Sequence, residues 1–200
     1  ITGHSTPSSN RAIETPIGAL VADAILWGTS GANGGAQIAL MNVGGVRASL
    51  TYAQSAGEGD GNITYAEAYA IAPFGNLLNT LDLTGAQLKA VLEQQYQTGI
   101  NRAPMLSLCV SEGFTYTWDA TRPEGQRVVA ESMKLNGVPM SQTATYRVAT
   151  LSFLAQGGDA FTAFKDGTNL LGGPEDLKNL VDFFKANPGL KAPTSRIDGL

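Results

Sequence analysis

The sequence is poor in the residues that most hydrolases use for catalysis and metal binding. Among its 200 residues it has one histidine, His4, and one cysteine, Cys109. A single cysteine excludes an internal disulfide, and one histidine leaves too few ligands for a two-metal phosphatase centre. Ser-His-Asp and Cys-His catalysis are excluded as well, because His4 lies in a polar N-terminal stretch and Cys109 in an apolar run. The chain is therefore predicted to be catalytically incomplete.

Basic residues and long apolar runs are also scarce. Lys and Arg number 13 against 17 Asp and Glu, for a formal net charge of −4. A nucleic-acid-binding face needs clustered Lys and Arg, so no nucleic-acid partner is expected. No apolar stretch reaches the length of a transmembrane helix, and neither a signal peptide nor a phosphate-loop motif of the GxxxxGK[ST] or GxGxxG kind is visible. The first residue is not methionine, which is typical of a mature product or an excised fragment.

The rest of the composition is that of an ordinary globular protein, with 43% apolar residues and 24 glycines. Residues 1–10 are polar and predict a linker or hinge remnant, and residues 11–200 predict one domain. An N-cap at Thr15, caps of the Thr64/Glu67 and Thr84/Gln87 kind, and helical periodicity predict helices over about 16–28, 64–71, 84–99 and 174–187. Strands are predicted over 38–43, 77–83, 114–118, 128–135 and 146–154, and the Asn136-Gly137 turn predicts a hairpin partner for 128–135 that starts at 138. This order favours a single α+β domain with a mixed β-sheet and flanking helices.

Two phenylalanines stand on glycine-containing turns just outside apolar runs. Phe74 lies in the segment Pro73-Phe74-Gly75-Asn76, and Phe153 is followed four residues later by Gly157-Gly158-Asp159. Two flat rings on loops suit a planar ligand, such as a nucleobase, that stacks between them. For Phe74 the local pattern by itself favours the alternative that the ring folds inward as part of the core.

Polar groups stand in two further glycine-rich segments, one of which follows Phe153. Asn42, Gly45 and Arg47 belong to the segment Asn42-Val43-Gly44-Gly45-Val46-Arg47, which offers an amide and a guanidinium beside a flexible backbone. The alternative there is a plain turn with the arginine in solvent. Asp159 suits an acceptor of ribose hydroxyls or, equally, the cap of a following helix.

Four segments, taken in order, resemble the C-terminal domain of the 5′-nucleotidase family, whose members also act as UDP-sugar hydrolases and cyclic-nucleotide phosphodiesterases. They are ETPIGALVADAIL (14–26), NVGGVRASL (42–50), ITYAEAYAIAPFGNLLNTLDLTGAQLKAVLE (63–93) and YRVATLSFLAQGGDAF (146–161). Each motif is weak by itself, whereas the ordered set is specific and covers roughly residues 11–198. The resemblance implies the mixed α+β fold of that domain.

The resemblance also implies a division of labour. This domain would bind a nucleotide or nucleoside, and a separate N-terminal metallophosphoesterase domain of the same polypeptide would hold two divalent metals and hydrolyse the ester. It implies that Phe74 and Phe153 sandwich the base, that Asn42 and Arg47 reach the ribose or phosphate, and that Asp159 accepts the ribose hydroxyls. The other positions that it implies for the substrate site are Asn76, Gly45, Gly158 and Arg11.

The family resemblance implies a periplasmic, cell-surface or secreted location and no metal or catalytic residue in this chain. Two alternatives remain open at this point: a free-standing nucleoside-binding module, and a surface-interaction domain that has kept the fold without the site.

Overall fold

Two β-sheets, rather than the single expected sheet, organise the chain. The computed structural model describes residue 1, residues 12–100 and residues 104–200. The larger sheet has five strands in the order β3-β1-β7-β2-β8, and the smaller has four in the order β6-β5-β4-β9. The strands of the larger sheet are β1 (Ile38–Asn42), β2 (Leu77–Thr84), β3 (Leu108–Val110), β7 (Thr145–Leu151) and β8 (Thr168–Glu175). Those of the smaller are β4 (Phe114–Trp118), β5 (Val128–Leu135), β6 (Val138–Pro139) and β9 (Ile197–Asp198).

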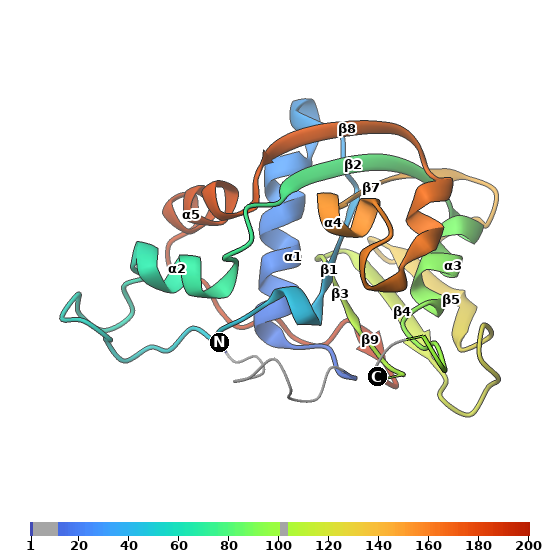
Figure 1. The fold of residues 1–200 in the computed structure, drawn as a ribbon, viewed down its shortest axis with the longest axis horizontal. Helices are drawn as coiled ribbons and strands as arrows, with labels where there is room; N and C mark the ends of the chain where they lie inside the picture. The colour runs from blue at the N-terminus through green and yellow to red at the C-terminus, as the bar shows by residue number, and fades with distance from the viewer. Residues whose placement is uncertain (2–11, 101–103) are drawn as a thin grey trace.

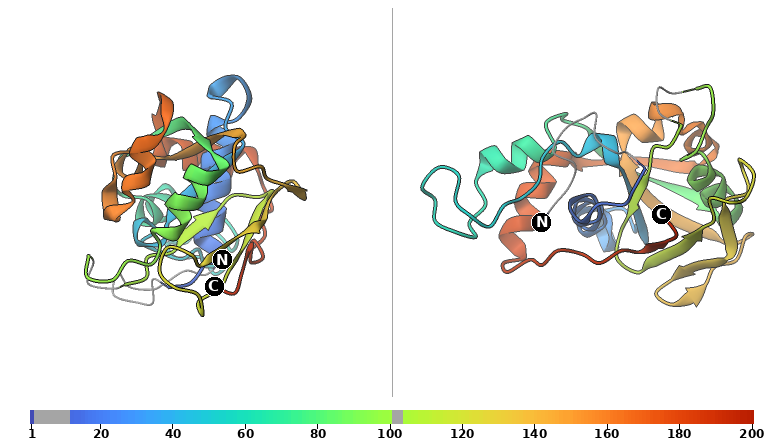
Figure 2. Two further views of the ribbon diagram at one scale, coloured as in Figure 1. Left: turned by 90° about the vertical axis from the view of Figure 1, so that its right-hand side faces the viewer. Right: turned by 90° about the horizontal axis from the view of Figure 1, so that it is seen from below.

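The larger sheet is covered on both faces, and β1 shows how. All five of its residues are buried. Ile38 and Leu40 point to a core shared with the smaller sheet and with helix α3 (Gly85–Glu93), whereas Ala39 and Met41 point to helices α1 (Pro16–Thr29) and α5 (Asp176–Ala186). Figures 1 and 2 show this layering, with α1 and α5 on one side of the larger sheet and α3 with the smaller sheet on the other. The expected α+β class with a mixed sheet is confirmed, because β1 runs parallel to β7 while the other pairs in that sheet are antiparallel.

Local sequence signals correctly predicted most helix starts. Thr15 caps α1 by accepting from the Gly18 amide, and both predicted capping boxes form, Thr64 with Glu67 at helix α2 (Tyr65–Ile71) and Thr84 with Gln87 at α3. The predicted Asn136-Gly137 hairpin joins β5 to β6, and both of its turn residues have positive φ. These features depend on neighbours in the chain, which explains why the sequence alone predicts them.

The third helix ends earlier than predicted. Its periodicity continues to Tyr96 and Gly99, yet α3 stops at Glu93. Gln95 is fully buried, and its side-chain amide donates to the Leu92 carbonyl and the Tyr116 hydroxyl and accepts from the Leu108 amide. These buried tertiary hydrogen bonds favour a turn over another helical turn, because leaving such groups unpaired is costly.

The C-terminal third contains a strand that the sequence analysis missed. Pro174 was expected to open the last helix but lies in β8, an edge strand where a missing N–H is tolerated. Helix α5 begins at Asp176 instead, and it buries Leu177, Leu180 and Phe183. The strand predicted over 146–154 likewise ends early, at Leu151, and gives way to the short helix α4 (Ser152–Ala155).

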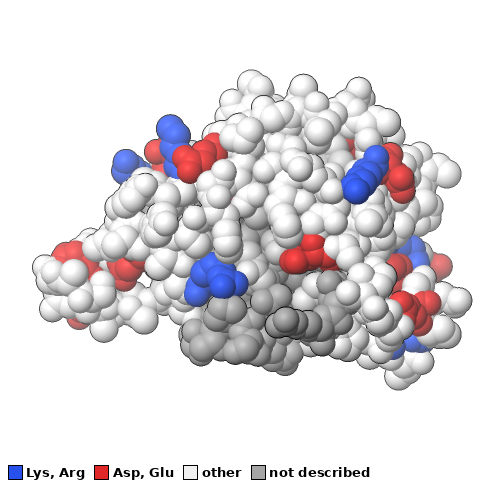
Figure 3. Space-filling model, viewed as in Figure 1, with Lys and Arg blue, Asp and Glu red and all other residues white. Residues whose placement is uncertain are grey.

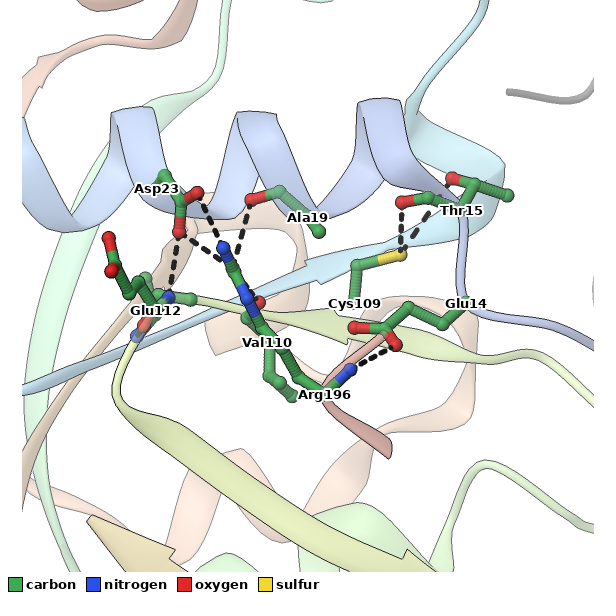
Figure 4. Close-up of polar contacts among 10 residues, drawn as sticks. Glu14, Thr15, Ala19, Asp23, Cys109, Val110, Glu112 and Arg196 are labelled. Atoms are coloured by element: carbon green, nitrogen blue, oxygen red, sulfur yellow. Dashed lines mark hydrogen bonds and ion pairs between the residues drawn. The ribbon is translucent and has the colours of Figure 1, made fainter. Parts of the chain in front are cut away.

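Arg196 ties the C-terminal segment to the start of the domain (Figure 4). Its guanidinium makes two hydrogen bonds to the Asp23 carboxylate, at 2.7 and 2.8 Å, and donates to the Val110 carbonyl at 2.7 Å. One oxygen of Glu14 accepts from the Arg196 amide at 2.8 Å and from the Ser195 hydroxyl at 2.9 Å. A segment without regular structure is thereby held across α1 and β3.

Three further expectations concern the N-terminal linker, the single cysteine and membrane-spanning helices. The predicted linker over 1–10 falls almost wholly outside the described residues, as does Arg11. Cys109 is buried, as its apolar run in the sequence indicates, and burial raises the pKa of its thiol to about 12. The structure places its Sγ beside the Thr15 carbonyl. No helix in the described ranges is long and apolar enough to cross a membrane.

Candidate functional site

The sheet brings the predicted site residues to one end of three neighbouring strands. Because β1 runs parallel to β7, with Ala39 opposite Ala149, the end of β1 at Asn42 lies level with the end of β7. Because β2 runs antiparallel to β7, with Leu78 opposite Leu151, the turn that precedes β2 lies at this same end. Asn42, Phe74 and Phe153 are thus neighbours, although more than a hundred positions separate the first from the last.

Phe74 projects from the surface rather than into the core. Its side chain is 55% exposed, so the alternative of inward burial is wrong. The Arg47 guanidinium carbon lies 5.7 Å from the centre of the Phe74 ring, and its Nη1 donates to the Gly44 carbonyl at 3.1 Å. Arg47 is therefore held over the ring by a cation–π contact and is not a solvated side chain beside a plain turn.

The turn that carries Phe74 is anchored by two residues that the sequence analysis missed. Asp176 accepts from the Asn76 backbone amide at 3.0 Å and from its side-chain Nδ2 at 3.3 Å, while the Asp176 amide donates to the Asn76 carbonyl. Ser152 donates to Asn76 Oδ1 at 3.4 Å and accepts from the Leu77 amide. Asp176 lies 100 positions from Asn76, so no local pattern could have found it.

Phe153 lies on the helical turn α4, not on a strand or an open loop. Its side chain is 44% exposed, and Gly158 packs directly against its ring. A Cβ added at Gly158 would lie 2.5 Å from the ring atom Cζ. A glycine at this position therefore lets the backbone cover one side of the ring while the remainder of the ring is exposed.

Asn42 and Asp159 form the polar end of the site. Asn42 Nδ2 donates to Asp159 Oδ2 at 2.8 Å. Asn42 is only 4% exposed, and its Oδ1 has no hydrogen-bond partner among the described residues. A Cβ at Gly45 would lie 2.7 Å from that oxygen, so glycine is needed there for the side chain of Asn42 to keep its place. A buried acceptor without a partner is the kind of group that a ligand hydroxyl satisfies.

Charged side chains are sparse on the face seen in Figure 3, where they stand in small separate groups and form no continuous basic patch. Among the described residues no group of three or more His, Cys, Asp or Glu side chains is placed to hold a metal ion. The arrangement offers two exposed rings, a guanidinium, a carboxylate and two amides. These groups can stack on and hydrogen-bond a planar polar molecule, but they offer no nucleophile–base pair.

The comparisons with known proteins agree with this fold. The family model described as the 5′-nucleotidase C-terminal domain matches residues 1–166. An apyrase of Tabanus yao is 35% identical over 159 residues, which are 74% of this chain and 27% of the apyrase. A cell wall protein of Listeria monocytogenes, Lmo0130, is 30% identical over 189 residues, which are 92% of this chain and 23% of that protein.

A solved structure gives the same result. The crystal structure of a 5′-nucleotidase precursor from Thermus thermophilus matches with a TM-score of 0.76 and 35% identity, over 94% of this chain and 37% of that one. The chain therefore spans about a quarter of the curated relatives and about a third of the solved structure. On the strength of the family match and the shared fold, this chain belongs to the 5′-nucleotidase C-terminal domain family.

Proposed function

We propose that this chain is the nucleotide- or nucleoside-binding domain of a two-domain 5′-nucleotidase and that it is inactive by itself. The single observation that carries the proposal is the placement of two exposed phenylalanine rings beside the Asn42–Asp159 pair at one end of three strands. The rings suit a base, and the carboxylate and buried amide oxygen suit ribose hydroxyls.

Each proposed contact is compatible with the geometry of its side chain. Arg47, which uses Nη1 for Gly44, keeps other N–H groups for the phosphate or ribose side. Asn76 is held by Asp176 and Ser152, yet an amide oxygen has two lone pairs and its nitrogen two hydrogens, so a base contact can share it. Gly45 and Gly158 supply close backbone approach. Arg11, a further proposed ligand residue, lies outside the described part of the chain.

The hydrolytic step is assigned to a separate N-terminal metallophosphoesterase domain of the same polypeptide, with two divalent metals bound there. The family match supports this division, as does the fraction of each relative that this chain covers. Periplasmic, cell-surface or secreted location is proposed with it, supported by the likeness to a protein named as a cell wall protein.

Titration calorimetry with adenosine, AMP and UDP-glucose tests the proposal. We expect weak but saturable binding of at least one of them, with no release of phosphate from AMP when divalent metals are added to this chain. Binding of none of the three would favour the surface-interaction alternative. A gene that carries no upstream DxH and GNH[DE] metal-ligand motifs would favour the free-standing binding module.

Gly158→Ala should weaken adenosine binding about tenfold, because the new methyl group pushes the Phe153 ring from its stacking position. The φ of Gly158 does not lie in the left-handed region, so alanine adds no backbone strain, and Tm should change little. Gly172→Ala is the matched control, since a Cβ there meets no atom within 4 Å. Equal affinities for the wild type and both variants would show that the Phe153 ring does not contact the base.

A further inference from the structure

The loop that carries Asp159 has a backbone conformation that its residues do not favour. Asp159 has φ 52° and ψ 25°, and the next residue, Ala160, has φ 65°. Two successive residues other than glycine thus lie in the left-handed region, where a Cβ crowds the backbone. Aspartate tolerates this region better than alanine, because its side chain can hydrogen-bond locally. The surrounding structure must therefore hold Ala160 in place.

Three glutamine side chains from α3 and the turn after it bind this loop. Gln87 Nε2 donates to the Asp166 carbonyl at 2.9 Å. Gln94 Nε2 donates to Thr162 Oγ1 at 2.9 Å, and its Oε1 accepts from the Ala163 amide at 2.9 Å. Gln87 and Gln94 therefore bind the loop after the buried Phe161, and the third glutamine, Gln97, binds it before Phe161.

Gln97 contacts the strained residue itself. Its Nε2 donates to the Ala160 carbonyl at 3.2 Å and to the Gln94 carbonyl at 2.7 Å, which uses both of its N–H groups. The side chain of Gln97 thus connects the end of α3 to the residue that follows Asp159.

We infer that Gln97, supported by Gln94, is a positioning residue that keeps Ala160 left-handed and thereby holds the Asp159 carboxylate against Asn42. This inference rests on the proposed function, in which Asp159 accepts the ribose hydroxyls. Without the hydrogen bond from Gln97, the loop relaxes toward an ordinary backbone conformation and Asp159 leaves its place beside Asn42. The Phe74 ring, beside Arg47, lies on contacts outside this loop, whereas the Phe153 ring packs against Gly158 of the same loop.

The test compares two ligands that differ only in the ribose hydroxyls, adenosine and 2′,3′-dideoxyadenosine, by calorimetry on the 200-residue chain. The wild type should prefer adenosine. Gln97→Ala should reduce that preference about fivefold, because the adenosine affinity falls more than the affinity for the dideoxy compound, which keeps its contact with Phe74. Ala160→Gly in the Gln97→Ala background should restore the preference, because glycine adopts the left-handed region without cost. Gln126→Ala, at an exposed glutamine before β5, is the control.

The possible outcomes distinguish the positioning role of Gln97 from the binding function of the domain. An equal loss of both ligands in Gln97→Ala, an unchanged preference, or no restoration by glycine would overturn the positioning role while leaving the binding function intact. A wild type that binds neither ligand would overturn the proposed function and this inference with it, and one that binds both equally would remove the role of Asp159. Should Gln97→Ala fail to fold, Gln97→Met, which keeps the length of the side chain without its N–H donors, carries the same expectation.

Discussion

Replacement of Phe74 and Phe153 together by alanine should lower the affinity for adenosine by about thirtyfold or more, because stacking on each ring contributes roughly 1–3 kcal/mol. Both rings are about half exposed, so their removal leaves no large cavity in the core. The free energy of unfolding should therefore change little, and calorimetric titration with a parallel thermal melt measures both quantities.

The matched control for this double variant removes two other exposed aromatic side chains. Tyr52 and Tyr65 are 76% and 66% exposed and line a different groove, beside Leu190 and Pro188. The Tyr52→Ala and Tyr65→Ala double variant should bind adenosine as the wild type does. If the phenylalanine double variant keeps the wild-type affinity, the base does not stack on these rings and the proposed function fails in its central part.

Among substitutions in the C-terminal segment, Arg196→Ala should destabilise the domain most. The free energy of unfolding should fall by about 2–4 kcal/mol and Tm by roughly 5–15 °C. The guanidinium and the Asp23 carboxylate are 12% and 18% exposed, so removal of the arginine leaves a largely buried carboxylate without its bidentate partner. The Val110 carbonyl loses its hydrogen bond from the guanidinium as well. Figure 4 shows that these contacts join three segments that are distant in the sequence.

An exposed ion pair provides the comparison for Arg196. Lys178 and Asp182 pair on the surface of α5 with side chains that are 69% and 39% exposed, so Lys178→Ala should cost no more than about 0.5 kcal/mol. Arg196→Lys should recover only part of the loss, since lysine keeps the charge but cannot bind the carboxylate in two places. Equal melting temperatures for Arg196→Ala and Lys178→Ala would mean that the C-terminal segment does not stabilise the domain.

Much of the fold could be predicted from short-range signals. The caps at Thr15, Thr64 and Thr84 and the turn at Asn136-Gly137 were correctly placed because each depends on residues within a few positions. The end of α3 and the strand β8 were not, because the competing partners of Gln95 and the pairing of β8 with β2 come from distant segments. Periodicity contains no information about such partners.

The candidate site, like the fold, could be predicted only in part from the sequence. The sequence by itself determined which residue types are available: two phenylalanines beside glycines, an arginine, a carboxylate, and almost no histidine or cysteine. This set of residues excludes Ser-His-Asp and Cys-His catalysis, and it favours the stacking of a planar ligand on the phenylalanine rings. Only the tertiary structure decided that Phe74 is exposed, that Arg47 lies over it, and that Asn42 meets Asp159 across 117 positions. The physical reason is that sheet pairing, which depends on contacts across the whole chain, brings the ends of β1, β2 and β7 together.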